Sequence, residues 1–230
     1  MNMKKTAICA AALVLMTALT GCGQNSGKTG TTVDNGKTDA QVEQVADAKV
    51  GENAFIITLY PDVAPITCEN FEKLVNEGFY DGLTFHRVIE GFMAQGGDPD
   101  GTGMGGSNCT IHGEFKLNGV ENNLSHQRGV VSMARANDPN SASSQFFICY
   151  DDCSEWLDGQ YAAFGEVKEG MEVVDSFLTV ERKTSASGEE ASSPVTPIVM
   201  EKVWQIENDA DGNPRVEIKM KPLGGTDSEQ

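Results

Sequence analysis

Apolar and polar positions along the chain form short, distinct patterns from about residue 50 onward. Phe55, Ile57 and Leu59 alternate with their neighbours, and Pro61 ends the run, so this segment is predicted to be a β-strand. Other short apolar runs lie between Gly, Asn and Asp residues and predict further strands. These runs are Phe85–Ile89, Phe92–Gln95, Gly129–Ala134, Gln145–Tyr150, Ala162–Val167 and Ile198–Ile206.

Two segments have apolar residues at helical spacing instead. Pro65 opens the first of these patterns and Gly78 ends it, which are the residues expected at a helix start and stop. The apolar positions are Ile66, Phe71, Leu74 and Val75 in the first segment and Met171, Val174, Phe177 and Leu178 in the second. Many short strands with two helices favour a closed barrel or a sandwich over a βαβ fold.

The N-terminus carries a different pattern. Lys4 and Lys5 precede an uncharged run, Thr6–Leu19, whose 14 residues are too few for a membrane-spanning helix. A positive segment followed by such a run predicts an export signal, residues 1–21. The run ends in Leu-Thr-Gly before Cys22, which resembles the lipobox of bacterial lipoproteins. Cys22 would then carry a lipid such as palmitate and anchor the chain outside the cytoplasm; the alternative is a plain signal peptide.

The rest of the chain divides by composition. Residues 22–49 are rich in Gly, Thr, Asn and Asp, which predicts a flexible linker. Residues 50–207 form the predicted domain, within which Lys183–Ser193 is expected to be an exposed loop. Residues 208–230 are expected to be an extension: Arg215–Lys221 pairs back as a hairpin strand, and the end frays.

Composition and charge narrow the class of protein. Hydrophobic residues make up 39% of the chain, as in ordinary globular proteins. There are 34 Asp and Glu against 17 Lys and Arg, a formal net charge of −17. Such an acidic chain repels phosphate backbones, so nucleic acid is not expected as a partner. We expect a monomer.

Cysteine spacing leaves the redox question open. Without Cys9 and Cys22, four cysteines remain in the predicted mature domain, and an exported chain could oxidise them. They are expected to be mostly free thiols, with Cys149 and Cys153 as the pair to check. The four are Cys68, Cys109, Cys149 and Cys153.

Generic cofactor and metal motifs fail in their context. Gly101, Gly103 and Gly106 form a G-x-G-x-x-G with no helical pattern after it, so a glycine-rich surface loop is the better interpretation. A calcium-like run at Asp209 lacks the required Gly and Glu. The three histidines have no ligand spacing, and no G-x-S-x-G is present. No metal or cofactor is expected.

Three segments carry the specific signal: Phe85–Asp98, then Ser132–Arg135 with Ser144–Ile148, and Trp156–Gly165. In this order they resemble the cyclophilin family of peptidyl-prolyl cis–trans isomerases from about residue 50 to residue 207. The resemblance implies a mainly β fold, a closed eight-stranded antiparallel barrel capped by two α-helices. It also implies proline-containing polypeptides as partners and a cyclosporin-type ligand.

The resemblance also assigns roles to individual residues. Arg87 matches the catalytic arginine, and Gln95 and Gln145 match groups that bind the substrate backbone. Ala134 matches the groove wall with Arg135 beside it, and Trp156 matches the cyclosporin-associated position. The residues matching the proline pocket are Phe92, Met93, Phe147 and Leu157. Arg87, Gln95 and Phe92 are therefore the expected catalytic set.

Two positions depart from the eukaryotic members of the family. Arg135 stands where those members often have Asn, and Tyr161 stands where they often have His. We expect altered substrate preference rather than lost activity. The predicted function is isomerisation of X–Pro bonds in exported proteins. The alternatives are a tethered module that binds proline segments with little turnover and a solute-binding lipoprotein, for which this core is small.

Overall fold

A computed structural model describes residues 50–184 and 191–224. The predicted signal peptide, Cys22 and most of the linker lie outside the described residues.

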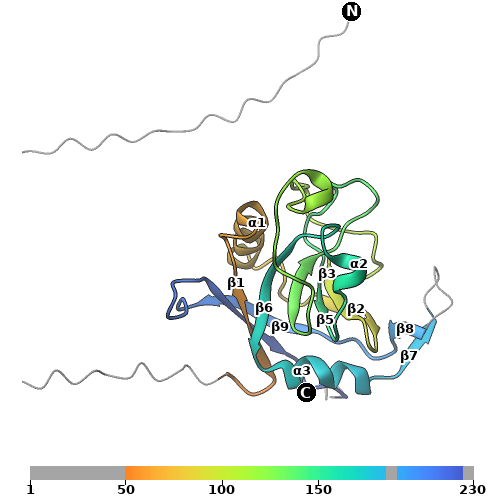
Figure 1. The fold of residues 1–230 in the computed structure, drawn as a ribbon. Helices are drawn as coiled ribbons and strands as arrows, with labels where there is room; N and C mark the ends of the chain where they lie inside the picture. The colour runs from red at the N-terminus through yellow and green to blue at the C-terminus, as the bar shows by residue number, and fades with distance from the viewer. Residues whose placement is uncertain (1–49, 185–190, 225–230) are drawn as a thin grey trace, which may run out of the picture. The chain divides into compact units, whose positions relative to one another are not determined.

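Eight strands form one antiparallel sheet in the order β2-β3-β5-β4-β6-β1-β10-β9 (Figure 1). Every strand predicted from the apolar pattern is present within a few residues of its expected bounds. The strands are β1 (Ala54–Leu59), β2 (Thr84–Ile89), β3 (Met93–Asp98), β4 (Val130–Met133), β5 (Phe146–Cys149), β6 (Ala163–Glu169), β9 (Met200–Ile206) and β10 (Arg215–Met220).

The expected closure of this barrel is not found. The ladder ends at β2 and β9, which are joined by one isolated bridge, Thr84 to Val199, and by short flanking contacts such as the Phe85 N–H to the Ile198 carbonyl, 2.9 Å. Pro197 has no N–H to donate just before this seam. The sheet is therefore curled, with its two edges close together, and is not a closed barrel.

The described residues form three α-helices, whereas the sequence predicts two. α1 (Pro65–Asn76) and α3 (Met171–Ser176) are the predicted helices, and Figure 1 shows them at opposite ends of the sheet. Pro65 occupies the start of α1, and α3 continues into the 3₁₀ turn η2 (Phe177–Thr179). The additional helix, α2 (Ser154–Leu157), is too short to show helical periodicity. A second 3₁₀ turn, η1, spans Lys116–Asn118.

Two segments outside the predicted core are more ordered than expected. The ends of the expected loop 183–193 pair as a small two-stranded sheet, β7 (Arg182–Thr184) with β8 (Ala191–Pro194). The expected hairpin strand of the extension is β10, and it pairs with β1 as well as with β9. Val216 and Ile218 of β10 are fully buried, so residues beyond 207 contribute to the main core.

The sheet has two apolar faces. On β5, Phe146 and Ile148 belong to the main core, whereas Phe147 and Cys149 belong to a smaller cluster on the opposite face. α1 covers the main core, and its Phe71 lies 5.5 Å from the Phe146 ring, edge to face. All four cysteines of the described domain are free thiols, and only Cys109 is exposed.

Candidate active site

One row of side chains crosses four neighbouring strands on the face opposite the main core. Arg87 on β2 pairs with Gln95 on β3, Gln95 pairs with Phe147 on β5, and Phe147 pairs with Ser132 on β4. Directly paired residues project to the same face of an antiparallel sheet. An irregularity at His86 shifts the register of β2, and this shift brings Arg87 opposite Gln95. The sheet therefore brings together residues that are 60 positions apart in sequence.

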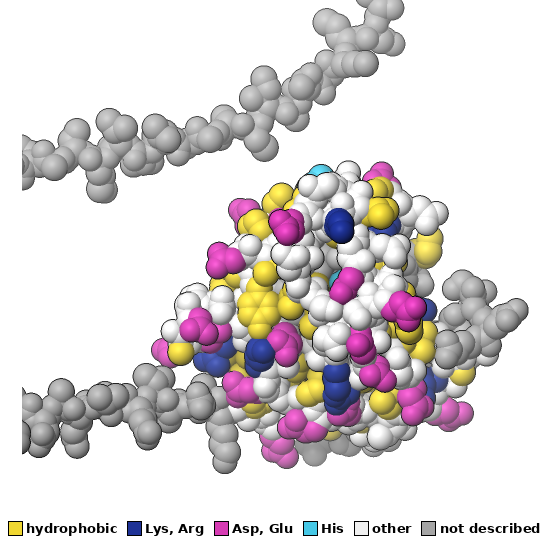
Figure 2. Space-filling model, viewed as in Figure 1, with side chains coloured by type: hydrophobic (Ala, Val, Ile, Leu, Met, Phe, Trp, Pro, Cys, Tyr) yellow, Lys and Arg dark blue, Asp and Glu magenta, His cyan; other side chains and the backbone are white. Residues whose placement is uncertain are grey.

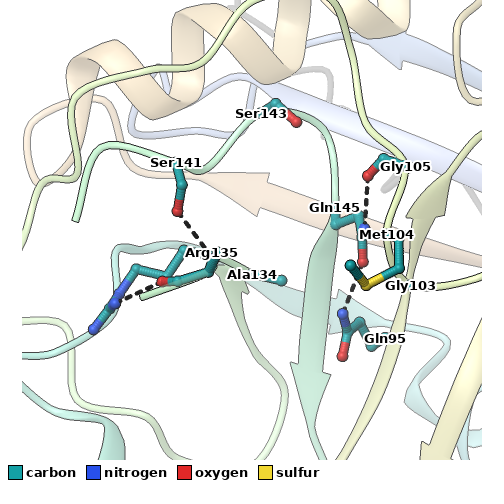
Figure 3. A pocket seen from close by; sticks show the side chains of 10 residues that line it. Gln95, Gly103, Met104, Gly105, Ala134, Arg135, Ser141, Ser143 and Gln145 are labelled. Atoms are coloured by element: carbon teal, nitrogen blue, oxygen red, sulfur yellow. Dashed lines mark hydrogen bonds between the residues drawn. The ribbon is translucent and has the colours of Figure 1, made fainter. Parts of the chain in front are cut away.

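A chain of hydrogen bonds fixes the polar part of this row. Arg87 Nη1 donates to Gln95 Oε1 at 3.4 Å, and Gln95 Nε2 donates to Gln145 Oε1 at 2.8 Å. Gln145 Nε2 then donates to the Gly105 carbonyl at 2.8 Å, as Figure 3 shows. These contacts set the orientation of both amides, because each oxygen accepts and each nitrogen donates. The three polar residues singled out by the sequence thus form one connected unit.

An aromatic pocket of about 150 Å³ opens beside this chain. It is lined by Arg87, Phe92, Met93, Gln95, Ala134, Arg135, Phe147, Leu157 and Tyr161. Every one of these residues was a candidate from the sequence. Phe92 was predicted to be inside a strand, but β3 begins one residue later, at Met93. Phe92 therefore lies in the preceding turn, where it can stand at the pocket rim.

The rim and the opposite wall of the aromatic pocket are built from ring contacts. The Arg87 guanidinium lies 5.8 Å from the centre of the Phe92 ring, and the half-exposed Trp156 packs on the same ring at 5.6 Å. Trp156 does not line the pocket itself. On the opposite wall, Tyr161 meets Phe147 edge-on at 5.8 Å. The walls are apolar and the Arg87 edge is charged.

Arg135, predicted to bind the substrate, makes most of its contacts with the protein itself. Its guanidinium lies over the Phe115 and Tyr161 rings, 5.1 and 4.8 Å from their respective centres. It also donates to the carbonyls of Gln160 and Ala136, at 3.0 and 2.9 Å. In Figure 3 the side chain extends away from Gln95 and Gln145. Arg135 therefore supports the Tyr161 ring while it also lines both pockets.

A glycine-side pocket of about 300 Å³ adjoins the aromatic pocket and shares Gln95, Ala134 and Arg135 with it. Its outer edge is the glycine-rich loop that includes the rejected dinucleotide motif. The buried Asp98 holds this loop. Burial alone would raise the pKa of the Asp98 carboxyl, but backbone N–H groups of the loop, including those of Asp100 and Gly103, hold it below the ordinary value. The Asp98 carboxylate thus fixes the loop, which forms the edge of the glycine-side pocket.

Sequence reasoning missed three residues next to the site. His126, Ser132 and Asp158 are linked by hydrogen bonds directly behind Phe147. They come from a loop, a strand and a helix end, so no spacing in the sequence connects them. Among residues 50–184 and 191–224, no group of three or more His, Cys, Asp or Glu side chains is arranged to hold a metal ion.

Acidic side chains are scattered over the face shown in Figure 2, without a single dominant patch. Within the described part of the chain, no helix is both long and apolar enough to cross a membrane.

The family model described as "Cyclophilin type peptidyl-prolyl cis-trans isomerase/CLD" matches residues 45–205. The chain belongs to this family. It is a cyclophilin-type peptidyl-prolyl cis–trans isomerase.

Related sequences and a solved structure are also named as peptidyl-prolyl cis-trans isomerases. The chain is 47% identical over 146 residues to peptidyl-prolyl cis-trans isomerase-like 1 of Rhizopus delemar, covering 63% of this chain and 84% of that protein. It is 49% identical over 120 residues to peptidyl-prolyl cis-trans isomerase B of Bacillus subtilis, covering 52% and 80%. A crystal structure of a Cryptosporidium parvum cyclophilin, determined in the presence of the dipeptide Ala-Pro, has a TM-score of 0.55 and 32% identity. That match covers 64% of this chain and 88% of the other.

Proposed function

We propose that this isomerase acts on X–Pro bonds of exported proteins outside the cytoplasm, and that Arg87 stabilises the twisted prolyl amide. The observation that carries the catalytic part is the row Arg87, Gln95 and Phe147, which places a cation, an amide and an apolar wall around one pocket. The proline ring would enter between Phe92, Phe147 and Leu157.

The chemistry needs no covalent step. Rotation about a peptide bond has a barrier of about 18–20 kcal/mol, because the nitrogen lone pair is delocalised into the carbonyl. In the twisted state this lone pair returns to the nitrogen, which becomes a hydrogen-bond acceptor. The Arg87 guanidinium, charged at any working pH, would donate to it. This contact exists only at the twisted state, so it lowers the barrier rather than merely tightening binding.

Gln95 and the pocket walls would hold the rest of the substrate. Gln95 Nε2 has two N–H groups; one reaches Gln145, and the other can hold the substrate carbonyl while the bond rotates. The apolar walls exclude water, which strengthens the Arg87 contact. Met93 on the pocket floor is almost fully buried.

The decisive test compares Arg87→Ala with the wild type in an assay of X–Pro exchange in a short peptide. We expect kcat/KM to fall by about 10²–10³-fold, mostly in kcat, which is the loss typical of a deleted transition-state donor. Arg215→Ala, on the β10 strand, is the matched control and should keep wild-type activity. Equal activity of Arg87→Ala and the wild type would refute the role of Arg87. Inactivity of the wild type would instead favour a module that binds proline segments.

The lipid anchor rests on the sequence around Cys22. We infer that the signal peptide is removed before Cys22, that the cysteine is acylated, and that residues 23–49 tether the isomerase to the membrane. The full chain, expressed in bacteria fed an alkyne analogue of palmitate, should incorporate label. Cys22→Ala should lose the label, whereas Cys109→Ala, which changes the exposed cysteine of the domain, should keep it. Label retained in Cys22→Ala would place the lipid on another residue and refute the Cys22 anchor, whereas a cleaved but unlabelled wild type would favour a plain signal peptide.

A cyclosporin-type ligand would contact Trp156. Its indole is half exposed and packs on Phe92 at the pocket rim, so a large cyclic peptide over the pocket would cover it. In a Trp204→Phe background, Trp156 is the single tryptophan, and its fluorescence should change on titration with cyclosporin. Trp156→Ala should weaken inhibition more than it lowers catalysis. An unchanged inhibition constant would remove Trp156 from the ligand site.

A further inference from the structure

A second chain of polar side chains lies behind the aromatic pocket. His126 is buried, and its Nδ1 lies 2.8 Å from Asp158 Oδ1 while its Nε2 lies 2.9 Å from Ser132 Oγ. Asp158 also accepts the backbone N–H of His126 at 2.9 Å and the Ser125 hydroxyl at 2.7 Å. The imidazole is therefore held at both ring nitrogens.

These contacts determine where the imidazole proton resides. An ionised carboxylate can only accept, so Nδ1 must carry the hydrogen that meets Asp158. Burial lowers the pKa of His126 below its ordinary value, although Asp158 acts in the opposite direction, so the ring is neutral near pH 7. In the neutral ring Nε2 is an acceptor, and the Ser132 hydroxyl donates to it.

The order Asp158, His126, Ser132 resembles that of a hydrolase triad, but the geometry excludes a nucleophilic role. Ser132 is completely buried in β4, between β5 and β6. The Phe147 side chain, paired with Ser132 and stacked on His126, separates the hydroxyl from the pocket. A substrate bound in the aromatic pocket meets the Phe147 ring and not the serine oxygen.

What the chain does contact is the wall of the pocket. The His126 ring stacks on Phe147 with centres 6.1 Å apart and an angle of 18°, while Tyr161 meets Phe147 edge-on. His126 also holds both ends of α2. Its carbonyl accepts the Cys153 N–H at 2.9 Å at the helix start, and its side chain binds Asp158 directly after Leu157.

We propose that His126, oriented by Asp158 and Ser132, is a positioning residue that fixes Phe147 and Leu157 in the arrangement that accepts the proline ring. Apolar side chains have no directional contacts of their own, and a misplacement of about 1 Å can cost a large factor in rate. The hydrogen bonds of Asp158 and Ser132 to His126 supply a fixed orientation, and His126 passes it to Phe147 through the ring stack. The proposal rests on the proposed use of the aromatic pocket for the substrate proline.

The test compares two serine-to-alanine substitutions. They differ in which contact of the hydrogen-bonded residues Asp158, His126 and Ser132 they affect. Ser132→Ala removes the contact that orients the ring beside Phe147, and we expect kcat/KM to fall about tenfold or more, with changes in both kcat and KM. Ser125→Ala removes a neighbouring bond to Asp158 but leaves the Asp158 contact to His126 intact. Ser125→Ala should therefore stay within about twofold of the wild type. Asp158→Asn should behave like Ser132→Ala.

A merely structural role is separated by two further measurements. Val216→Ala opens a cavity in the main core on β10, three strands away from β4, and should lower thermal stability without changing kcat or KM. Nitrogen-15 NMR of the histidines in the full chain should show His126 with its proton on Nδ1. Asp158→Asn should change this signal, whereas Val216→Ala should not.

The outcomes separate this proposal from the proposed function. Wild-type kinetics for Ser132→Ala and Asp158→Asn, or a proton on Nε2 in the wild type, would overturn the positioning role. If Asp158→Asn does not fold, Ser132→Ala and the NMR signal of the wild type still decide the question. If the wild type itself fails to turn over a proline peptide, the proposed function falls, while the NMR signal still reports on the polar chain.

Discussion

Phe146 and Phe147 are neighbours in sequence but serve opposite faces of the same sheet. Phe146 points into the main core, where Phe71, Tyr80 and Phe85 surround its ring edge to face. Phe147 points to the other face and forms a wall of the aromatic pocket. The inner face is packed by aromatic and aliphatic side chains, whereas the outer face combines rings with fixed polar groups. Because side chains alternate along a strand, one short segment can support both the fold and the catalytic site.

The largest effects should come from truncating these two rings separately. Phe146→Ala removes a fully buried ring from the main core and should cost about 3–5 kcal/mol of unfolding free energy. Phe147→Ala should cost less unfolding free energy than Phe146→Ala, because the Phe147 ring borders an open pocket. It should lower kcat/KM much more than Phe146→Ala does. Chemical denaturation measures the first effect, and the peptide exchange assay, run where both variants are folded, measures the second.

This comparison fails if the two variants behave alike. A Phe147→Ala protein with wild-type kcat/KM would remove the outer ring from the site. A folded Phe146→Ala protein with selectively lost activity would mean that the inner face controls catalysis directly. Phe85→Ala, another inner ring, is the control for a general loss of core packing.

A smaller effect is expected from cutting the polar chain of the outer face. Gln145→Ala removes the link between Gln95 and the Gly105 carbonyl, so Gln95 loses its fixed orientation. We expect kcat/KM to fall about tenfold, equivalent to about 1.4 kcal/mol, with little loss of stability. Gln205→Ala is the matched control, since this glutamine donates to Glu72 on the exposed surface. Equal kinetics for the two variants would show that the Gln95 orientation is not needed.

The two faces also differ in how far the sequence could predict them. The strands and the helices α1 and α3 follow from local periodicity, and the residues of the aromatic pocket follow from three motifs. The open seam between β2 and β9 could not be predicted, because it depends on which backbone groups meet across distant segments. The same holds for β10, whose pairing with β1 joins residues about 160 positions apart.

The residues behind Phe147 show this limit most clearly. His126 and Asp158 are 32 positions apart, and neither belongs to a pattern with a spacing that indicates chemistry. A lone histidine in a sequence is usually a packed or exposed residue, and the spacing of the three histidines indicates nothing else. Only the fold shows that one of them is buried, bonded at both nitrogens and stacked on the pocket wall.

The smallest expected effect concerns pH and tests the partly buried His86 together with the buried His126. Burial lowers the pKa of both His86 and His126 below the ordinary value of 6.5, so below pH 6.5 both bind protons more readily in the unfolded chain than in the folded one. Below pH 6.5 the unfolded state therefore binds more protons than the folded state, and the free energy of unfolding falls as the pH is lowered. Above pH 6.5 this contribution is constant. Denaturant unfolding measured across this range should show a plateau followed by a decline toward acid. His126→Gln should make the decline shallower, whereas the exposed His112→Gln should leave its slope unchanged. A wild-type protein whose stability rises as the pH falls from 6.5 would mean that a folded-state histidine gains its proton instead. The assignment of a neutral His126 imidazole stacked on Phe147 would then be wrong.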